Sequence, residues 1–169
     1  MSLHQKKICL LGLFGVGKTS LLRRFVENVF DEKYHSTIGV KVDRKRVQLA
    51  EPAEALDLLI WDIAGLDEIT PVVRNYFRGA QGALVVHDVS RPESLDALAE
   101  YCDQFLAVAP QAKLVAVGNK CDLVHARNLA VSNLKKLGKQ KLLPHFFTSA
   151  KSGENVEAAF LALTRMLVS

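Results

Sequence analysis

The sequence predicts an α/β fold in which a six-stranded, mostly parallel sheet is flanked by about five helices. Strand and helix patterns alternate along the whole chain, and several strand patterns are almost continuously apolar. Apolar runs of this kind are typical of strands that are covered on both faces. The chain has 169 residues, and 49% of them are hydrophobic, which suits one domain, 1–169, with a good-sized core.

The strands are predicted from short apolar runs, the first of which comes directly before a glycine-rich loop. About six residues around Glu51 and Pro52 separate the second strand from the third. This is a hairpin length, so we expect that pair to be antiparallel at one edge of the sheet and the other strands to be parallel. The expected strands are 6–12, 38–49, 56–62, 82–88, 113–119 and 143–148.

The helices are predicted from apolar residues at helical spacing and from their start signals. Pro92 lies at the beginning of the third helix, where proline favours the first turn. The last helix is expected to begin after Ser152. The expected helices are 18–28, 68–78, 92–108, 129–138 and 153–167.

Residues 12–19 read GLFGVGKT and match the phosphate-binding loop pattern G-x-x-x-x-G-K-S/T without a mismatch. They lie between an apolar strand and a helix, which is the context that this loop requires. Glycines let the backbone wrap a polyphosphate, and backbone N–H groups form an anion-binding nest at the helix N-terminus. Lys18 is expected to reach the β- and γ-phosphates, and the Thr19 hydroxyl to bind Mg²⁺. The alternative is a glycine-rich turn in another kind of α/β protein.

Asp62-Ile63-Ala64-Gly65 closes the third predicted strand. An aspartate at this place is the usual second metal element of a protein with a phosphate-binding loop. Gly65 can offer its N–H to a γ-phosphate with little steric cost. The alternative for Asp62 is a strand-end aspartate that caps a turn.

Asn119-Lys120-Cys121-Asp122 ends the fifth predicted strand and favours a guanine site. The Asp122 carboxylate is a pure acceptor and matches the two adjacent donors of guanine, which adenine lacks. Asn119 can tie loops together, and the Lys120 stem can pack on the base. Thr148-Ser149-Ala150-Lys151 ends the sixth strand, and the Ala150 N–H can donate to guanine O6, although alone this would be an ordinary loop.

These four motifs, in this order and spacing, resemble those of the Ras-like small GTPases over residues 6–168, and most closely those of the Rab group. YHSTIGV at 34–40 and WDIAG at 61–65 resemble the two Rab switches. YFRGA at 76–80 resembles the Rab Y-Y-R-G-A segment, and VVHDVS at 85–90 resembles V-V-Y-D-V-T. The resemblance implies a P-loop NTPase fold, with Mg²⁺ as cofactor and GTP or GDP as ligand. It also implies a molecular switch in signalling or vesicle transport.

The resemblance also implies roles for single residues. Thr37 would coordinate Mg²⁺ and sense the γ-phosphate, Phe30 would pack across the guanine ring, and Tyr34 would cover the phosphates. The implied metal ligands are Thr19, Thr37 and Asp62, and the implied catalytic residues are Lys18, Thr37, Gly65 and Leu66. The implied nucleotide-binding residues are Gly15, Val16, Gly17, Lys18, Thr19, Ser20, Phe30, Tyr34, Thr37, Gly65, Asn119, Lys120, Asp122, Ser149, Ala150 and Lys151.

Two positions depart from the pattern of an active small GTPase. Leu66 stands where the family carries the glutamine that orients the attacking water, and leucine has no hydrogen-bonding group for that role. Phe14 stands where the family usually carries a small residue, and its ring would crowd the γ-phosphate and an incoming arginine finger. We therefore expect slow hydrolysis and a weak response to activating proteins. The alternatives are that Leu66 is an engineered substitution, or that Asp67 or Glu68 positions the water.

Partner proteins are expected to bind through residues 30–45 and 65–78, but with altered preferences. Lys41 and Val42 stand where Rab proteins usually have Asp and Phe, and Asp67-Glu68 replaces a usual Glu-Arg. Compared with the usual Rab surface, this surface is altered in charge and has less aromatic area. Because aromatic residues dominate the anchors of protein interfaces, familiar Rab partners are expected to recognise it less well.

Three functions remain open at this point. The first is a guanine-nucleotide switch with slow GTPase activity, and the second is a GTP-bound interaction module that has lost catalysis. The third, an ATP-using kinase with a phosphate-binding loop, is disfavoured by Asn119, Lys120 and Asp122.

The composition bears on the partners and the cellular compartment of the protein. The net charge is +4, but no basic helix or aromatic–basic interleaving indicates nucleic-acid binding. Two basic clusters, at 41–46 and 135–141, are interpreted as a charged edge strand and a solvated helix face, with an acidic partner site as the alternative. Three cysteines without metal spacing indicate a reducing cytoplasm. We expect a monomer that attaches to membranes only through a lipidated C-terminal tail of a longer native form.

Overall fold

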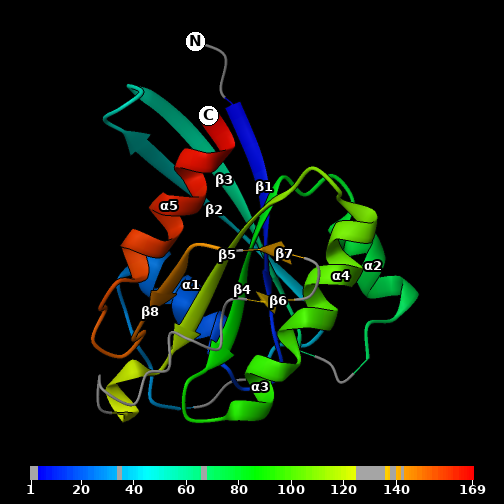
Figure 1. Cartoon of the computed structure of the whole chain (residues 1–169). Helices are drawn as coiled ribbons and strands as arrows, with labels where there is room; N and C mark the ends of the chain where they lie inside the picture. The colour runs from blue at the N-terminus through cyan, green and yellow to red at the C-terminus, as the bar shows by residue number, and fades with distance from the viewer. Residues whose placement is uncertain (1–3, 34–35, 66–67, 125–135, 138–139, 142) are drawn as a thin grey trace.

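The computed structural model describes residues 4–33, 36–65, 68–124, 136–137, 140–141 and 143–169. Its main sheet has six strands in the order β2-β3-β1-β4-β5-β8 (Figure 1). Strand β2 pairs with β3 in antiparallel fashion at one edge, and the other neighbours are parallel. The strands are β1 (His4–Leu11), β2 (Val40–Leu49), β3 (Glu54–Ile63), β4 (Gly82–Asp88), β5 (Lys113–Asn119) and β8 (His145–Phe147). The predicted fold class is therefore confirmed, including its antiparallel edge strand.

Helices cover both faces of this sheet (Figure 1). On one face, α1 and α5 meet through the stacked rings of Phe25 and Phe160, whose centroids are 4.0 Å apart. On the other face, α2 and α4 meet through Phe77 and Phe105, in an edge-to-face contact with 5.3 Å between centroids. The helices are α1 (Lys18–Glu27), α2 (Pro71–Phe77), α3 (Pro92–Asp96), α4 (Leu98–Val108) and α5 (Val156–Val168). Two apolar cores thus hold the sheet from both sides.

Two predicted helices differ from the observed ones. The helix predicted at 92–108 is divided into α3 and α4 at Ala97, which keeps helical dihedral angles. Most of the helix predicted at 129–138 lies outside the described residues, and its end is wrong. Lys136–Leu137 form strand β6, which pairs antiparallel with β7 (Gln140–Lys141). Gly138 follows in the sequence, and glycine is a poor helix former.

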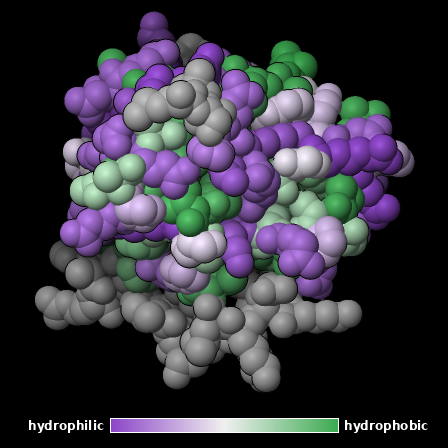
Figure 2. Space-filling view, turned by 90° about the horizontal axis from the view of Figure 1, so that it is seen from above, coloured by the Kyte–Doolittle hydropathy of each residue, from purple (hydrophilic) through white to green (hydrophobic). Residues whose placement is uncertain are grey.

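The surface agrees with the charged edge strand that the sequence predicts. Along β2 the side chains of Lys41, Arg44 and Arg46 are exposed, and Arg44 forms an ion pair with the buried Asp57 of β3. Figure 2 shows one face of the molecule, on which hydrophilic residues cover most of the described surface and hydrophobic residues form small groups between them. Within the described part of the chain, no helix has the length and apolar character needed to cross a bilayer.

A pair of histidines lies where β4 and β8 approach each other across β5. The Nε2 atoms of His87 and His145 are 3.2 Å apart, and the rings are nearly parallel. Burial lowers the pKa of His87 to about 4, although the Asp88 carboxylate acts in the opposite direction. Burial and the neighbouring His87 lower the pKa of His145 to about 4. Both rings are therefore neutral at pH 7.

The histidine pair predicts a pH-dependent stability. An unfolded histidine titrates near 6.5, so between about pH 6.5 and pH 4 the unfolded chain binds more protons than the folded chain. Stability is then complete above about pH 6.5 and falls as the pH drops towards 4, by about 3 kcal/mol for each histidine. His145→Gln should lose roughly half of this pH dependence. Urea unfolding at pH 7 and pH 4.5 measures it.

Gln111→Asn is the control for this experiment, because Gln111 is exposed and does not titrate. It should keep the pH dependence of the parent. Equal pH dependence in the parent and in His145→Gln would contradict the assignment to the pair.

Candidate functional site

The phosphate-binding loop connects β1 to α1, and its glycines are required by the close approach of neighbouring groups. Gly17 has φ +99°, and a Cβ there would collide with the amide nitrogen of Asn119. Gly12 has φ +147°, and a Cβ there would collide with the Val86 carbonyl of β4. The glycines therefore allow the loop to lie directly against the ends of the neighbouring strands.

Lys18 lies inside this loop rather than on the surface. Its ammonium donates to the carbonyl oxygens of Gly12 (2.8 Å) and Leu13 (3.1 Å), and the residue is only 6% exposed. Burial lowers the pKa of Lys18 to about 8, while the charge of Asp62 raises it. The charge of Asp62 helps to keep this ammonium protonated, and a buried ammonium favours an anionic ligand at this place.

The three predicted metal ligands come together from helix α1, strand β3 and the loop before β2. The Thr19 hydroxyl donates to Asp62 Oδ2 at 2.6 Å and lies 2.6 Å from the Thr37 hydroxyl. Asp62 is fully buried, and burial raises the pKa of its carboxyl group. Its other oxygen, Oδ1, is buried without a hydrogen-bond partner among the described residues. An unpartnered buried carboxylate oxygen beside two hydroxyls fits a hard divalent cation such as Mg²⁺.

The residues predicted to bind a base lie at the end of β5 and in the loop after β8. Asn119 donates to the Val16 carbonyl at 3.0 Å and accepts hydrogen bonds from the Thr148 hydroxyl and the Ala150 N–H. Asp122 accepts a hydrogen bond from the Ser149 hydroxyl at 2.8 Å, which orients its exposed carboxylate. The predicted acceptor, Asp122, and the predicted backbone donor, Ala150, are thus each held by a neighbouring side chain.

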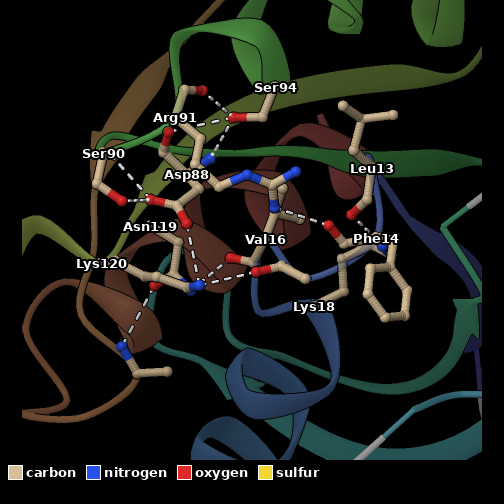
Figure 3. A network of polar contacts seen from close by, with 12 residues as sticks. Leu13, Phe14, Val16, Lys18, Asp88, Ser90, Arg91, Ser94, Asn119 and Lys120 are labelled. Atoms are coloured by element: carbon tan, nitrogen blue, oxygen red, sulfur yellow. Dashed lines mark hydrogen bonds and ion pairs between the residues drawn. The ribbon is translucent and has the colours of Figure 1, made fainter. Parts of the chain in front are cut away.

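The end of β4 and the loop after it contribute two residues, Asp88 and Arg91, that the sequence interpretation did not assign to the site. Lys120 donates to the Gly15 carbonyl at 2.7 Å and forms an ion pair with the buried Asp88 at 2.9 Å. Arg91 donates to the Phe14 carbonyl at 2.8 Å (Figure 3). The segment that contains Asp88 was noted only for its resemblance to V-V-Y-D-V-T, which gave no role to its charged residues.

A pocket of about 340 Å³ lies between these groups. Most predicted nucleotide-binding residues line it, whereas Val16 and Ser149 are buried behind it and act through their hydrogen bonds. Tyr34 and Leu66 lie outside the described residues. The lining that the sequence interpretation did not assign includes Arg23, Val29, Asp31, Glu32, Lys33, Ala64 and Leu123.

Phe14 and Gly65 lie at the end of the pocket that the phosphate-binding loop forms. The Phe14 side chain lines the pocket and is 53% exposed. A Cβ on Gly65 would collide with the Phe14 nitrogen and the Leu13 carbonyl carbon. The segment after β3 therefore packs directly on the loop backbone, with a bulky ring at the rim.

Comparison with known proteins shows which family this chain resembles. The Ras family model matches residues 7–169. The human Ras-related protein Rab-22A is 34% identical over 170 residues, which cover 100% of this chain and 87% of that protein. Rab-4B of Rattus norvegicus is 35% identical over 164 residues, or 96% of this chain and 76% of that protein. RABD2c of Arabidopsis thaliana is 35% identical over 94% of this chain and 78% of that protein.

The packing around the loop predicts that Gly17→Ala lowers the stability of the fold. The new methyl group collides with Asn119 at a positive φ, so we expect a loss of about 3 kcal/mol in the free energy of unfolding. Gly79→Ala is the matched control, because Gly79 has φ +75° but a Cβ there would meet no atom of the described residues within 4 Å. It should cost about 1 kcal/mol. Urea unfolding measures both, and equal costs would contradict the tight fit at Gly17.

Proposed function

Because this chain belongs to the Ras family, we propose that it is a guanine-nucleotide switch that binds GTP or GDP with Mg²⁺ and hydrolyses GTP slowly. GTP binding and GTP hydrolysis in general follow from membership of the family and from its Rab-type relatives. The slow rate and the roles of single residues are our proposal. The observation that best supports the nucleotide switch is the arrangement of the pocket. A phosphate-binding loop, a cluster of hard oxygen ligands and the residues of the base site all meet there.

We propose that Asp122 selects guanine. Its carboxylate would accept from the N1–H and the exocyclic amine of guanine. The Ala150 N–H, whose nitrogen lies 3.3 Å from the Asn119 oxygen, would share its hydrogen bond with guanine O6. Phe30 and Lys120 also line the pocket and would pack on the base. Adenine would leave the carboxylate without donors, and an unsatisfied charged acceptor is costly.

We propose that Thr19, Thr37 and Asp62 hold Mg²⁺. The unpartnered Oδ1 of Asp62 supports this assignment. When bound, Mg²⁺ neutralises charge on the phosphate oxygens. Lys18 would add its ammonium charge to the β- and γ-phosphates, and the Gly65 N–H would donate to the γ-phosphate. These groups stabilise the charge of the transferring phosphoryl group through their positions.

The slow rate is inferred from Leu66 and supported by the place of Phe14. A leucine at position 66 offers no hydrogen bond to an attacking water. The Phe14 ring at the rim of the pocket would hinder an arginine supplied by a partner. Such partners contribute up to about 10⁵-fold in rate, so the GTP-bound state would last much longer.

The switch would act through residues 30–45 and 65–78. The contact between the hydroxyls of Thr19 and Thr37 ties the first of these segments to α1, and a bound γ-phosphate would order both segments. Partner proteins would then recognise the ordered surface. The three cysteines are free and buried, which supports a cytoplasmic location.

A second candidate function is a GTP-bound interaction module without hydrolysis. The same two residues, Phe14 and Leu66, favour it. It uses the same pocket and the same partner surface, so only a rate of hydrolysis separates it from a slow GTPase.

Leu66→Gln should restore hydrolysis. We expect single-turnover hydrolysis of preloaded GTP with Mg²⁺ to be at least about tenfold faster than in the parent, because glutamine can position the water. Leu66→Ala is the control that removes bulk without adding a polar group, and it should remain slow. A parent that hydrolyses GTP as fast as Leu66→Gln would contradict the role given to Leu66.

Asp122→Ala should abolish the preference for guanine. Competition between GTP and ATP for the pocket should shift by about 10³-fold, because the paired acceptor is lost. Asp103→Ala, at an exposed position of α4, is the control and should keep the preference. Unchanged competition in Asp122→Ala would mean that another group reads the base.

A further inference from the structure

Five consecutive carbonyl groups of the phosphate-binding loop accept hydrogen bonds from side chains. Lys18 donates to residues 12 and 13, Arg91 to residue 14, Lys120 to residue 15 and Asn119 to residue 16. In a trans peptide the C=O and the following N–H point in opposite directions. Each of these hydrogen bonds therefore fixes the direction of one loop amide.

By this rule, Arg91 controls the amide of Gly15. Its Nη1 donates to the Phe14 carbonyl at 2.8 Å, and the N–H in that peptide belongs to Gly15. The same Nη1 would lie 3.2 Å from a Cβ on Gly15, so the guanidinium lies alongside this peptide. With the Phe14 carbonyl directed towards Arg91, the Gly15 N–H points to the opposite side of the peptide.

The position of Arg91 is itself fixed by its surroundings. Its backbone N–H donates to the Asp88 carbonyl, and its own carbonyl accepts from the N–H and the hydroxyl of the fully buried Ser94. Its Nε is paired with the Glu93 carboxylate at 3.2 Å. A long side chain held at both ends loses little further conformational entropy when it binds the loop.

We propose that Arg91 is a positioning residue for the bound nucleotide. It holds the Phe14 carbonyl, keeps the Gly15 amide directed at the phosphates and thereby slows the release of the nucleotide. Figure 3 shows that Arg91 and Lys120 reach the loop from different elements, so Arg91 acts beside the residues of the guanine motif. This inference rests on the proposed binding of guanine nucleotides.

The test measures the release of a fluorescent GDP from the Mg²⁺-loaded full chain. Arg91→Ala should release GDP about fivefold faster, a moderate effect because the guanidinium is partly exposed. Arg91→Lys should restore part of the difference, since a lysine keeps a charged donor. Arg165→Ala is the matched control, because Arg165 is exposed on α5, and it should release GDP at the parent rate.

Two readouts separate positioning from general damage to the fold. The ratio between the release rates of GDP and inosine diphosphate, which lacks the exocyclic amine, should be the same in Arg91→Ala as in the parent. The base site would then be intact. In the GDP complex, the NMR signal of the Gly15 amide should shift in Arg91→Ala and stay in place in Arg165→Ala.

The possible failures are distinguishable. If the parent binds neither GDP nor GTP, the proposed function is wrong, and this inference falls with it. If the parent binds GDP but Arg91→Ala releases it at the parent rate, or leaves the Gly15 amide unshifted, only the role of Arg91 is overturned. Should Arg91→Ala fail to fold, Arg91→Gln carries the same expectation, because its shorter, neutral side chain does not reach the loop.

Discussion

One buried side chain, Asn119, connects the parts on which the site depends. Its amide nitrogen donates to the phosphate-binding loop at Val16, and its oxygen accepts from Thr148 and Ala150 in the loop after β8. Asn119 ends β5, and the parallel pairing of β5 with β4 and β8 brings these strand ends to one edge of the sheet. A donor and an acceptor on one rigid amide therefore keep the proposed phosphate and base regions at a constant separation.

Much of the fold and of the site could be predicted because short stretches of the sequence indicate the local structure. The apolar strands, the hairpin length at 50–55 and the loop GLFGVGKT each report a local geometry. The three proposed metal ligands lie far apart in sequence. Two of them could be assigned from strand or loop patterns, and the third from the family resemblance. The structure brings Thr37 and Asp62 each within hydrogen-bond distance of Thr19.

What the sequence did not predict depends on side chains that meet only after folding. Asp88 and Arg91 follow an ordinary apolar strand, and nothing local indicates that they reach Lys120 and Phe14. The two-residue strands β6 and β7 are too short to give a periodic pattern. The division of the long helix at Ala97 has no signal either, because alanine is the best helix former. Such features follow from tertiary packing, which local propensity does not record.

The contact between Gly65 and the phosphate-binding loop has a mechanical consequence. Because a Cβ on Gly65 would overlap with the loop backbone, no compressible side chain separates the two segments. A closer approach of Gly65 would therefore press directly on the backbone at Leu13 and Phe14. The contact is therefore stiff against any closer approach of the two segments.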